Sequence, residues 1–299
     1  MKEKTDIIAS KYLGQKTNGS EKYDNSLLVA IPRDENRVKY EINSNNLIFN
    51  GWDIWHAYEF SALTENNLPV TSLLKLKYNC TSKYLVESKS LKLYLNSFNM
   101  SNFGKTRNEC ICICKNLIEK DLSSKLQTQV EVEFLSDNTT KTKLFENYTD
   151  ITKSVDETKL EIKDFEEAPE LLKTETLNTL NEYRLKFDSL RSNCRVTHQP
   201  DFGDLFIYYK SYKHITEDSL IKYLTSFRKE YHFHEECVEM IYKRLFSLLN
   251  SEDELLVCAL YTRRGGIDIS PARWSKNFIP KDIDKLIDLK TFARYGVKQ

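Results

Sequence analysis

The sequence has no surplus of either charge and no long apolar run. Lysine plus arginine and aspartate plus glutamate number 44 each, so the formal net charge at pH 7 is zero. A broad nucleic-acid surface needs a basic surplus, and we therefore expect no direct nucleic-acid partner. No apolar stretch approaches the roughly 20 residues of a membrane span, and the mixed-charge N-terminus lacks the apolar core of a signal peptide. We therefore expect no membrane association.

Glycine is also scarce, with eight in 299 residues, and no glycine-rich dinucleotide fingerprint follows a strand-like stretch. A Rossmann domain is therefore not supported. The seven cysteines occur without a secretion signal, which predicts reduced thiols and a cytoplasmic location. The length allows one large core or two cores of roughly 150 residues each.

What is present is a pattern of strands and helices that occurs twice. Alternating side chains predict strands at 50–60, 71–78 and 128–136, and helical spacing predicts helices at 90–98 and 108–126. The second half gives strands at 183–190, 205–212, 255–262 and 266–269, with helices at 217–228 and 234–249. The first 25 or so residues indicate a polar, irregular arm, and 137–168 a polar linker with a further strand before residue 165. We predict an α+β fold.

A sequence repeat supports duplication. Residues 90–98 and 219–227 are identical at six of nine positions, and Glu109-Cys110 echoes Glu236-Cys237. The boundary between the halves is placed near residue 150, giving units 1–150 and 151–299, each of the ββααββ type. The pair His234-Glu235 replaces Arg107-Asn108 in the second half. Because each half carries groups that the other lacks, we expect one composite site where the halves meet.

The segment 191–204 has no counterpart in the first half and indicates a loop between strands. It places Cys194 between Arg191 and Arg195, whose positive charges favour a thiolate, with Asp201 seven residues beyond the cysteine. A thiol with a carboxylic acid in reach is suited to covalent addition with proton transfer. The alternative is a buried structural cysteine, because free cysteines are among the most buried residues.

Several motifs together resemble one family, the NADPH-dependent 7-cyano-7-deazaguanine reductases, which are the nitrile reductases of queuosine biosynthesis. The resemblance rests on Glu87-Ser88-Lys89-Ser90-Leu91-Lys92-Leu93-Tyr94, on residues 192–201, on residues 226–237, and on Tyr261 to Ile269. Residues 53–59 are also similar, so the match runs in order from about 50 to 275. It implies two tandem tunnelling-fold halves, each an antiparallel sheet with two helices, that join side by side into barrels.

The resemblance also implies roles for individual residues. Cys194 would attack the nitrile and form a thioimide, and Asp201, protonated near neutral pH, would supply the proton, with His234 assisting later transfers. The substrate-binding residues implied are Val86, Glu87, Ser88, His234 and Glu235. The NADPH-binding residues implied are Ser88, Lys89, Arg264 and Gly265, with Arg263 as a neighbour that could share the task. Cys194 and Cys237 would pair reversibly as oxidative protection.

Two other functions stay open from the sequence. A zinc-dependent pterin-type cyclohydrolase of the same fold would need metal ligands, for which His232, His234 and the cysteines at 110, 112 and 114 are candidates. The three cysteines lie on a predicted helix, where alternate residues point apart, so we expect no metal site. A non-catalytic purine-binding protein is the other alternative. A duplicated chain that must close a barrel also predicts a homodimer.

Overall fold

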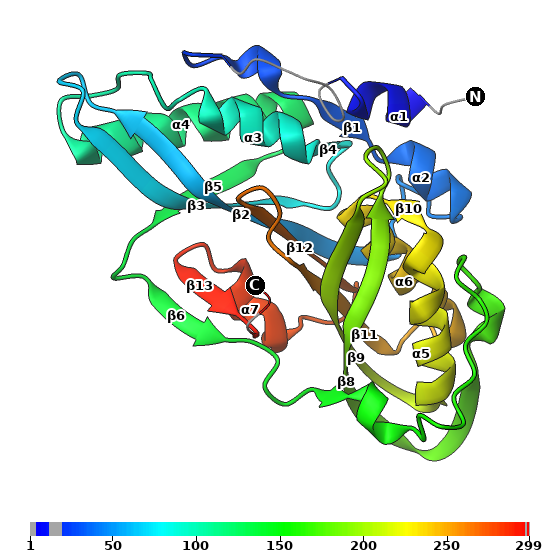
Figure 1. Cartoon of the computed structure of the whole chain (residues 1–299). Helices are drawn as coiled ribbons and strands as arrows, with labels where there is room; N and C mark the ends of the chain where they lie inside the picture. The colour runs from blue at the N-terminus through cyan, green and yellow to red at the C-terminus, as the bar shows by residue number, and fades with distance from the viewer. Residues whose placement is uncertain (1–3, 12–19, 297, 299) are drawn as a thin grey trace.

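The computed structural model describes residues 4–11, 20–296 and 298, and within them the predicted α+β class is confirmed (Figure 1). The strands are β1 (Ala30–Pro32), β2 (Phe49–Leu63), β3 (Pro69–Asn79), β4 (Tyr84–Val86), β5 (Val130–Leu135), β6 (Thr140–Lys143), β7 (Thr149–Asp150), β8 (Thr174–Cys194), β9 (Pro200–Ile215), β10 (Tyr231–His232), β11 (Glu254–Tyr261), β12 (Ile267–Ser275) and β13 (Thr291–Arg294). The helices are α1 (Lys4–Ala9), α2 (Asp34–Lys39), α3 (Ser88–Asn96), α4 (Arg107–Leu126), α5 (Glu217–Ser226), α6 (His234–Leu248) and α7 (Asp284–Ile287). None of these helices combines the length and apolarity that crossing a bilayer requires.

One continuous sheet runs through both parts of the chain. Its strands follow the order β10-β8-β9-β11-β12-β2-β3-β5, and β7 adds to β8. Strands β12 and β2 are neighbours in this order, and they are antiparallel from Ile267 opposite Ala57 to Ser275 opposite Phe49. The strands contributed by the early and late parts of the sequence are therefore joined by backbone hydrogen bonds.

Two hydrophobic cores lie under two pairs of helices. Helices α3 and α4 pack on β2, β3 and β5 through buried residues such as Leu74, Cys110 and Ile118. Helices α5 and α6 pack on β8, β9 and β11 through Ile207 and Ile241, among others. Each fully buried side chain of this kind contributes roughly 1.5–3 kcal/mol of transfer free energy. The alternation of strand side chains leaves a second face of the sheet to be covered.

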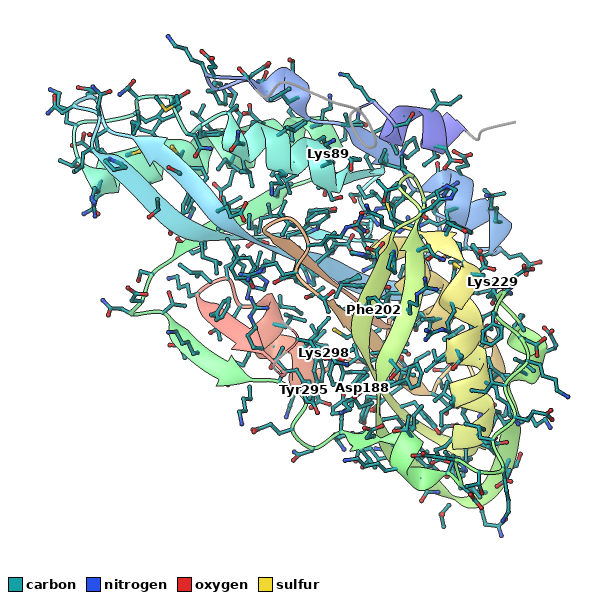
Figure 2. The ribbon with its side chains drawn as sticks, in the orientation of Figure 1. Lys89, Asp188, Phe202, Lys229, Tyr295 and Lys298 are labelled. Atoms are coloured by element: carbon teal, nitrogen blue, oxygen red, sulfur yellow. The ribbon has the colours of Figure 1, made fainter. Side chains whose placement is uncertain are left out.

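The C-terminal segment covers that second face. Leu286 of α7 packs in one cluster with Ile54 of β2 and Phe206 of β9. A further strand was expected before residue 165, as the last strand of the first ββααββ unit. Strand β6 lies in that region, but it pairs in parallel with β13 and does not join the main sheet, so it does not complete that unit. Near the chain end, Lys298 donates a hydrogen bond to the carbonyl of Asp188 (Figure 2).

A buried ion network links the two cores. Asp53 of β2 pairs with Arg33 and with Arg273, and Glu239 of α6 pairs with Arg37 at 2.7 Å and with Arg273 at 2.9 Å. All five side chains are at most 3% exposed. The network explains why β12 continues to Ser275, six residues beyond the predicted end, because the pairing makes a buried arginine and aspartate compatible with a core strand.

Two predictions about irregular segments are wrong. Residues 4–9 of the predicted polar arm form α1, which packs near β1, whereas residues 12–19 lie outside the described part. The predicted loop 191–204 is mostly strand, since β8 ends at Cys194 and β9 begins at Pro200. Only residues 195–199 connect them. The ends of these two strands carry many polar and charged side chains, so the alternation of apolar and polar residues that indicates a strand is absent there.

Candidate active site

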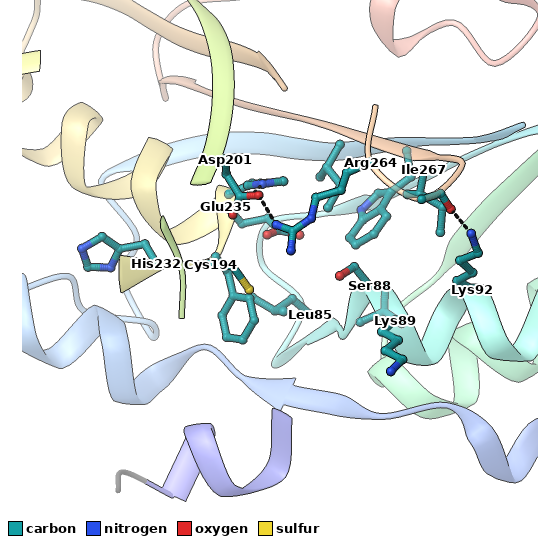
Figure 3. Close-up of a pocket in the computed structure, with 16 residues that line it drawn as sticks. Leu85, Ser88, Lys89, Lys92, Cys194, Asp201, His232, Glu235, Arg264 and Ile267 are labelled. Carbon is teal, nitrogen blue, oxygen red and sulfur yellow. Dashed lines mark hydrogen bonds and ion pairs between the residues drawn. The ribbon is translucent and has the colours of Figure 1, made fainter. Parts of the chain in front are cut away.

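A cavity of about 380 Å³ opens where four elements meet: the start of α3, the tip of the β8–β9 hairpin, the start of α6 and the β11–β12 turn (Figure 3). Its lining consists of Trp55, Leu85, Val86, Ser88, Lys89, Lys92, Cys194, Asp201, His232, Phe233, His234, Glu235, Arg264, Gly265, Ile267 and Ile269. Every predicted site residue except Glu87 is among them. The early part of the chain supplies one wall and the late part the other, as expected for a composite site.

Cys194 lies at the end of β8, half-buried, with its sulfur in the cavity lining. Its backbone N–H donates to the carbonyl of Gln199 at 2.8 Å, and its own carbonyl accepts from the N–H of His198 at 2.9 Å. On the other side it stands opposite His232 of β10. These backbone contacts place Cys194 where a paired strand meets the short 195–199 turn, and not within the longer loop expected from the sequence.

The two flanking arginines do not face the thiol. Arg195 pairs with Asp6 of α1 at 2.6 Å and with Glu236 of α6 at 3.1 Å, and Arg191 donates to the backbone carbonyl of Arg228. Neither lines the cavity. Activation of Cys194 by these two residues stays a prediction. Arg195 instead ties the 195–199 turn to two helices.

Asp201 is buried between Arg264 and His234. Its Oδ1 lies 2.5 Å from Nη1 of Arg264, and its Oδ2 lies 3.5 Å from Nε2 of His234. Burial raises the pKa of Asp201, but His234 and Arg264 outweigh it, and the net pKa is below the ordinary value. In this arrangement Asp201 is a carboxylate near neutral pH, contrary to the protonated acid expected from the sequence.

Glu235 is the carboxyl group that the cavity keeps uncharged. It is 2% exposed and its Oε1 has no hydrogen-bond partner among the described residues. Burial, with a smaller contribution from the nearby Asp53 charge, raises the pKa of Glu235 to about 8. An unpartnered buried acceptor at a cavity wall is available to a ligand that carries N–H donors.

Glu87 has a different position from the one predicted. Its carboxylate accepts from the backbone N–H groups of Lys89 at 2.8 Å and Ser90 at 2.7 Å, so it caps the N-terminus of α3. It is 1% exposed and does not line the cavity. Contact between Glu87 and a ligand stays a prediction. Its visible effect is to hold Ser88 and Lys89 at the cavity wall.

Cations gather at one rim of the cavity. Lys89 and Lys92 follow each other by one turn on α3, and Lys92 reaches the carbonyl of Gly265 at 2.5 Å (Figure 3). Arg264 stands across from them, bound to Asp201, to Thr197 at 3.0 Å and to Gln199 at 2.5 Å. Three cations around one opening are suited to phosphate groups.

The β11–β12 turn depends on glycine at that rim. Gly266 has φ of +81°, and an added Cβ would lie 2.4 Å from the Glu59 carboxylate carbon, so a larger residue does not fit. Lys92 was missed from the sequence, although its spacing of three from Lys89 on a helix could have indicated it. Trp55, with its indole N–H buried and unpartnered among the described residues, was also missed, because its strand pattern gave no sign of a cavity.

Metal ligands are not gathered anywhere in the described residues as a group of three or more. Cys110 and Cys114 are buried on the inner side of α4, while Cys112 is exposed. All seven thiols are free, and burial raises the pKa of Cys237 to about 12. Reversible pairing of Cys194 with Cys237 stays a prediction.

Comparison with known proteins gives the family. A family model described as nitrile reductase, 7-cyano-7-deazaguanine-reductase N-term, matches residues 20–134, and one described as QueF-like protein matches residues 200–281. The NADPH-dependent 7-cyano-7-deazaguanine reductase of Colwellia psychrerythraea is 37% identical over 266 residues, covering 88% of this chain and 91% of that protein. The chain belongs to the 7-cyano-7-deazaguanine reductase family of nitrile reductases, and the resemblance predicted from its motifs is confirmed.

Proposed function

We propose that the protein reduces the nitrile of 7-cyano-7-deazaguanine to an aminomethyl group with NADPH, in queuosine biosynthesis, and that Cys194 is the nucleophile. The observation that carries the proposal is the joint position of Cys194, Asp201, His234 and Glu235 on one cavity. Cys194 lies outside both matched family segments, so its role rests on this geometry together with the resemblance.

The substrate base is held through Glu235. A guanine edge presents a ring N–H and an exocyclic amine side by side, and a carboxylate can accept both. The free Oε1 of Glu235 and the backbone around Val86 and Ser88 are placed for this contact. In that orientation the nitrile points toward the Cys194 wall of the cavity. Glu87 acts here by positioning the start of α3.

The covalent step forms a bond between Sγ of Cys194 and the nitrile carbon. The attacking form is the thiolate of Cys194, one C–N π bond breaks and the nitrogen takes a proton, so the product is a neutral thioimide. The His234–Asp201 pair supplies that proton: Nε2 of His234 holds it, and the Asp201 carboxylate stabilises the imidazolium. Full reduction to the amine also returns the thiol, because the C–S bond must break between the two reductions.

The residues at the cationic rim fit NADPH. Ser88, Lys89, Arg264 and Gly265, with Lys92 added by the structure, are placed to hold its phosphates. When bound, NADPH supplies the hydride for each of the two reductions. Arg264 donates three of its five N–H groups to Asp201, Thr197 and Gln199, and its other donors are those that would meet a phosphate.

The architecture that we propose is two tandem tunnelling-fold units, 1–150 and 151–299. The two separate hydrophobic cores, each under a pair of helices, support this division. A homodimer and a cytoplasmic location stay predictions. Light scattering of the purified protein tests the first, with a mass of twice 35.2 kDa expected.

One assay tests the function. Purified protein is mixed with 7-cyano-7-deazaguanine and NADPH, and cofactor oxidation is followed with product formation. The proposal predicts about two NADPH oxidised per aminomethyl product. A folded protein that binds the base without oxidising NADPH would instead be a purine-binding protein. Metal-dependent hydrolysis of a pterin precursor without NADPH would identify a cyclohydrolase.

A further inference from the structure

Tyr261, the last residue of β11, lies flat against the imidazole of His234. The ring centroids are 3.8 Å apart and the planes differ by 10°. Tyr261 is 1% exposed, and it neither lines the cavity nor belongs to the predicted site residues. The contact therefore covers one face of the imidazole and leaves the ring edge for proton transfer.

The His234 ring has few other constraints. Nε2 faces Asp201 at 3.5 Å, a long distance for a hydrogen bond, and Nδ1 is buried without a partner among the described residues. A histidine that transfers protons is usually oriented by a hydrogen bond to its second ring nitrogen. Since His234 has none in the described structure, the plane of its ring depends on the stacked face.

The space for Tyr261 depends on the residue opposite it in the sheet. Gly203 of β9 is its cross-strand partner, and a Cβ added there would lie 3.2 Å from Cδ1 and 3.4 Å from Cε1 of the tyrosine ring. Gly203 stands two residues after Asp201 on the same strand. The strand that carries the carboxylate thus also leaves room for the aromatic ring that orients its partner.

We propose that Tyr261 is a positioning residue for proton transfer: its ring holds the imidazole of His234 in line with Asp201, and Gly203 leaves room for that ring. This inference rests on the proposed function, because it assigns His234 a role in the reduction. The stacking itself does not depend on the reaction. It can therefore be measured in the free protein.

Two substitutions separate the ring from its hydroxyl. The Tyr261 hydroxyl is buried next to the Cys237 thiol, and Tyr261→Phe removes that contact while keeping the ring that stacks on His234. Tyr261→Leu removes the ring. We expect kcat within about twofold of wild type for Tyr261→Phe, and a kcat about 10–100-fold lower for Tyr261→Leu with KM little changed, because misplacing a catalytic group by about 1 Å has this cost.

A spectroscopic measurement reports the stack directly. With carbon-13-labelled histidine, the five imidazoles give separate signals, and His234→Asn identifies one of them. The ring current of a stacked aromatic ring moves the imidazole signals of His234 upfield. We expect this displacement in wild type and Tyr261→Phe and its loss in Tyr261→Leu. Gly203→Ala, whose added Cβ would meet the Tyr261 ring, should give a smaller displacement and an intermediate kcat.

The measurements distinguish failure of the positioning role from failure of the proposed function. Wild-type kcat in Tyr261→Leu, or an equal loss in Tyr261→Phe and Tyr261→Leu, would overturn the positioning role while the reductase activity stands. An unshifted His234 signal in the wild type would also overturn it. A wild-type protein that does not reduce the nitrile would overturn the proposed function and this role with it. A Tyr261→Leu protein that does not fold leaves the decision to Gly203→Ala, where wild-type kcat would contradict the proposal.

Discussion

Asp201 and His234 face each other at the cavity, with Oδ2 of the carboxylate 3.5 Å from Nε2 of the imidazole. They come from β9 and α6, 33 residues apart in sequence, and Arg264 holds the other carboxylate oxygen at 2.5 Å. Burial by itself would favour a protonated Asp201, but His234 and Arg264 together hold its pKa below the usual value. Asp201 is therefore a carboxylate in this arrangement, and this assignment leads to the first prediction.

Asp201→Asn should lower kcat by a factor on the order of 10²–10⁴, because the imidazolium loses its stabilising carboxylate. The matched control is Asp204→Asn on the same strand. Asp204 faces the other side of the sheet, toward Lys298 at 3.4 Å, and we expect a nearly unchanged kcat. Steady-state rates measured from NADPH oxidation give both values. An equal loss of kcat in the two variants would mean that the substitutions act by disturbing strand β9 and not by impairing proton transfer.

Substrate binding at pH 7 should release a proton from Glu235. Its pKa in the free protein is about 8, so the carboxyl is mainly protonated, and the two N–H donors of the base favour the carboxylate and lower that pKa. Affinity should therefore rise from pH 6 to pH 8 and level off above. Calorimetry in buffers of different ionisation enthalpy counts the released protons. Glu235→Gln should bind more weakly and release none; release unchanged in that variant would exclude Glu235 as the source.

Loss of one partner from the buried ion network should strongly destabilise the fold. Glu239→Gln leaves Arg37 and Arg273 without a shared carboxylate, and we expect a loss of about 3–5 kcal/mol in the free energy of unfolding. The control is Glu161→Gln, whose pair with Lys163 is exposed and is expected to contribute less than about 1 kcal/mol. Urea unfolding measures both. Similar small losses would contradict the account of the network.

The same network makes the free energy of unfolding depend on pH in the acidic range. Burial raises the pKa of Glu239, but Arg37 and Arg273 outweigh it and bring the value to about 2, below the roughly 4.3 of an unfolded glutamate. Its contribution to stability is therefore fully present above about pH 4.3 and is lost as pH falls toward 2. Unfolding measured between pH 5 and 2 should show a smaller decline for Glu239→Gln than for wild type. Parallel curves would contradict this assignment.

The cationic rim should determine the affinity for NADPH. Lys92→Gln should raise the KM for NADPH several-fold and leave the KM for the base nearly unchanged, because we propose that the cationic rim holds the NADPH phosphates, and Lys92 lies at that rim, apart from Glu235 (Figure 3). Lys120→Gln, an exposed lysine on α4, is the control. A larger effect on the base than on NADPH would place the cofactor elsewhere.

Much of the fold could be read from local periodicity. The ends of α4 fall within a residue of the predicted 108–126, because its apolar stripe is regular. The strand predicted at 266–269 ends too early compared with β12. A buried arginine is not expected in a core strand, and Arg273 is buried only because it pairs with Asp53 and Glu239, which come from distant parts of the chain. Helix α1 was missed because a six-residue helix owes its stability to packing and not to propensity.

In the site, too, local motifs could be predicted, whereas properties that depend on contacts between distant residues could not. Cys194, Glu235 and Arg264 were predicted from motifs, and the cavity brings them together. The charge state of Asp201 could not be predicted, because it depends on the positions of His234 and Arg264 in space. The stacking of Tyr261 on His234 is likewise invisible in a sequence, since the two residues meet only when β11 and α6 pack.

The central claim is that Cys194 forms a covalent bond with the nitrile carbon. The direct measurement is the intact mass of the protein after incubation with 7-cyano-7-deazaguanine in the absence of NADPH. Wild type should gain the mass of one substrate molecule, and Cys194→Ala should gain none while still binding the base. The absence of an adduct on folded, substrate-bound wild type, or an adduct that persists in Cys194→Ala, would contradict the account.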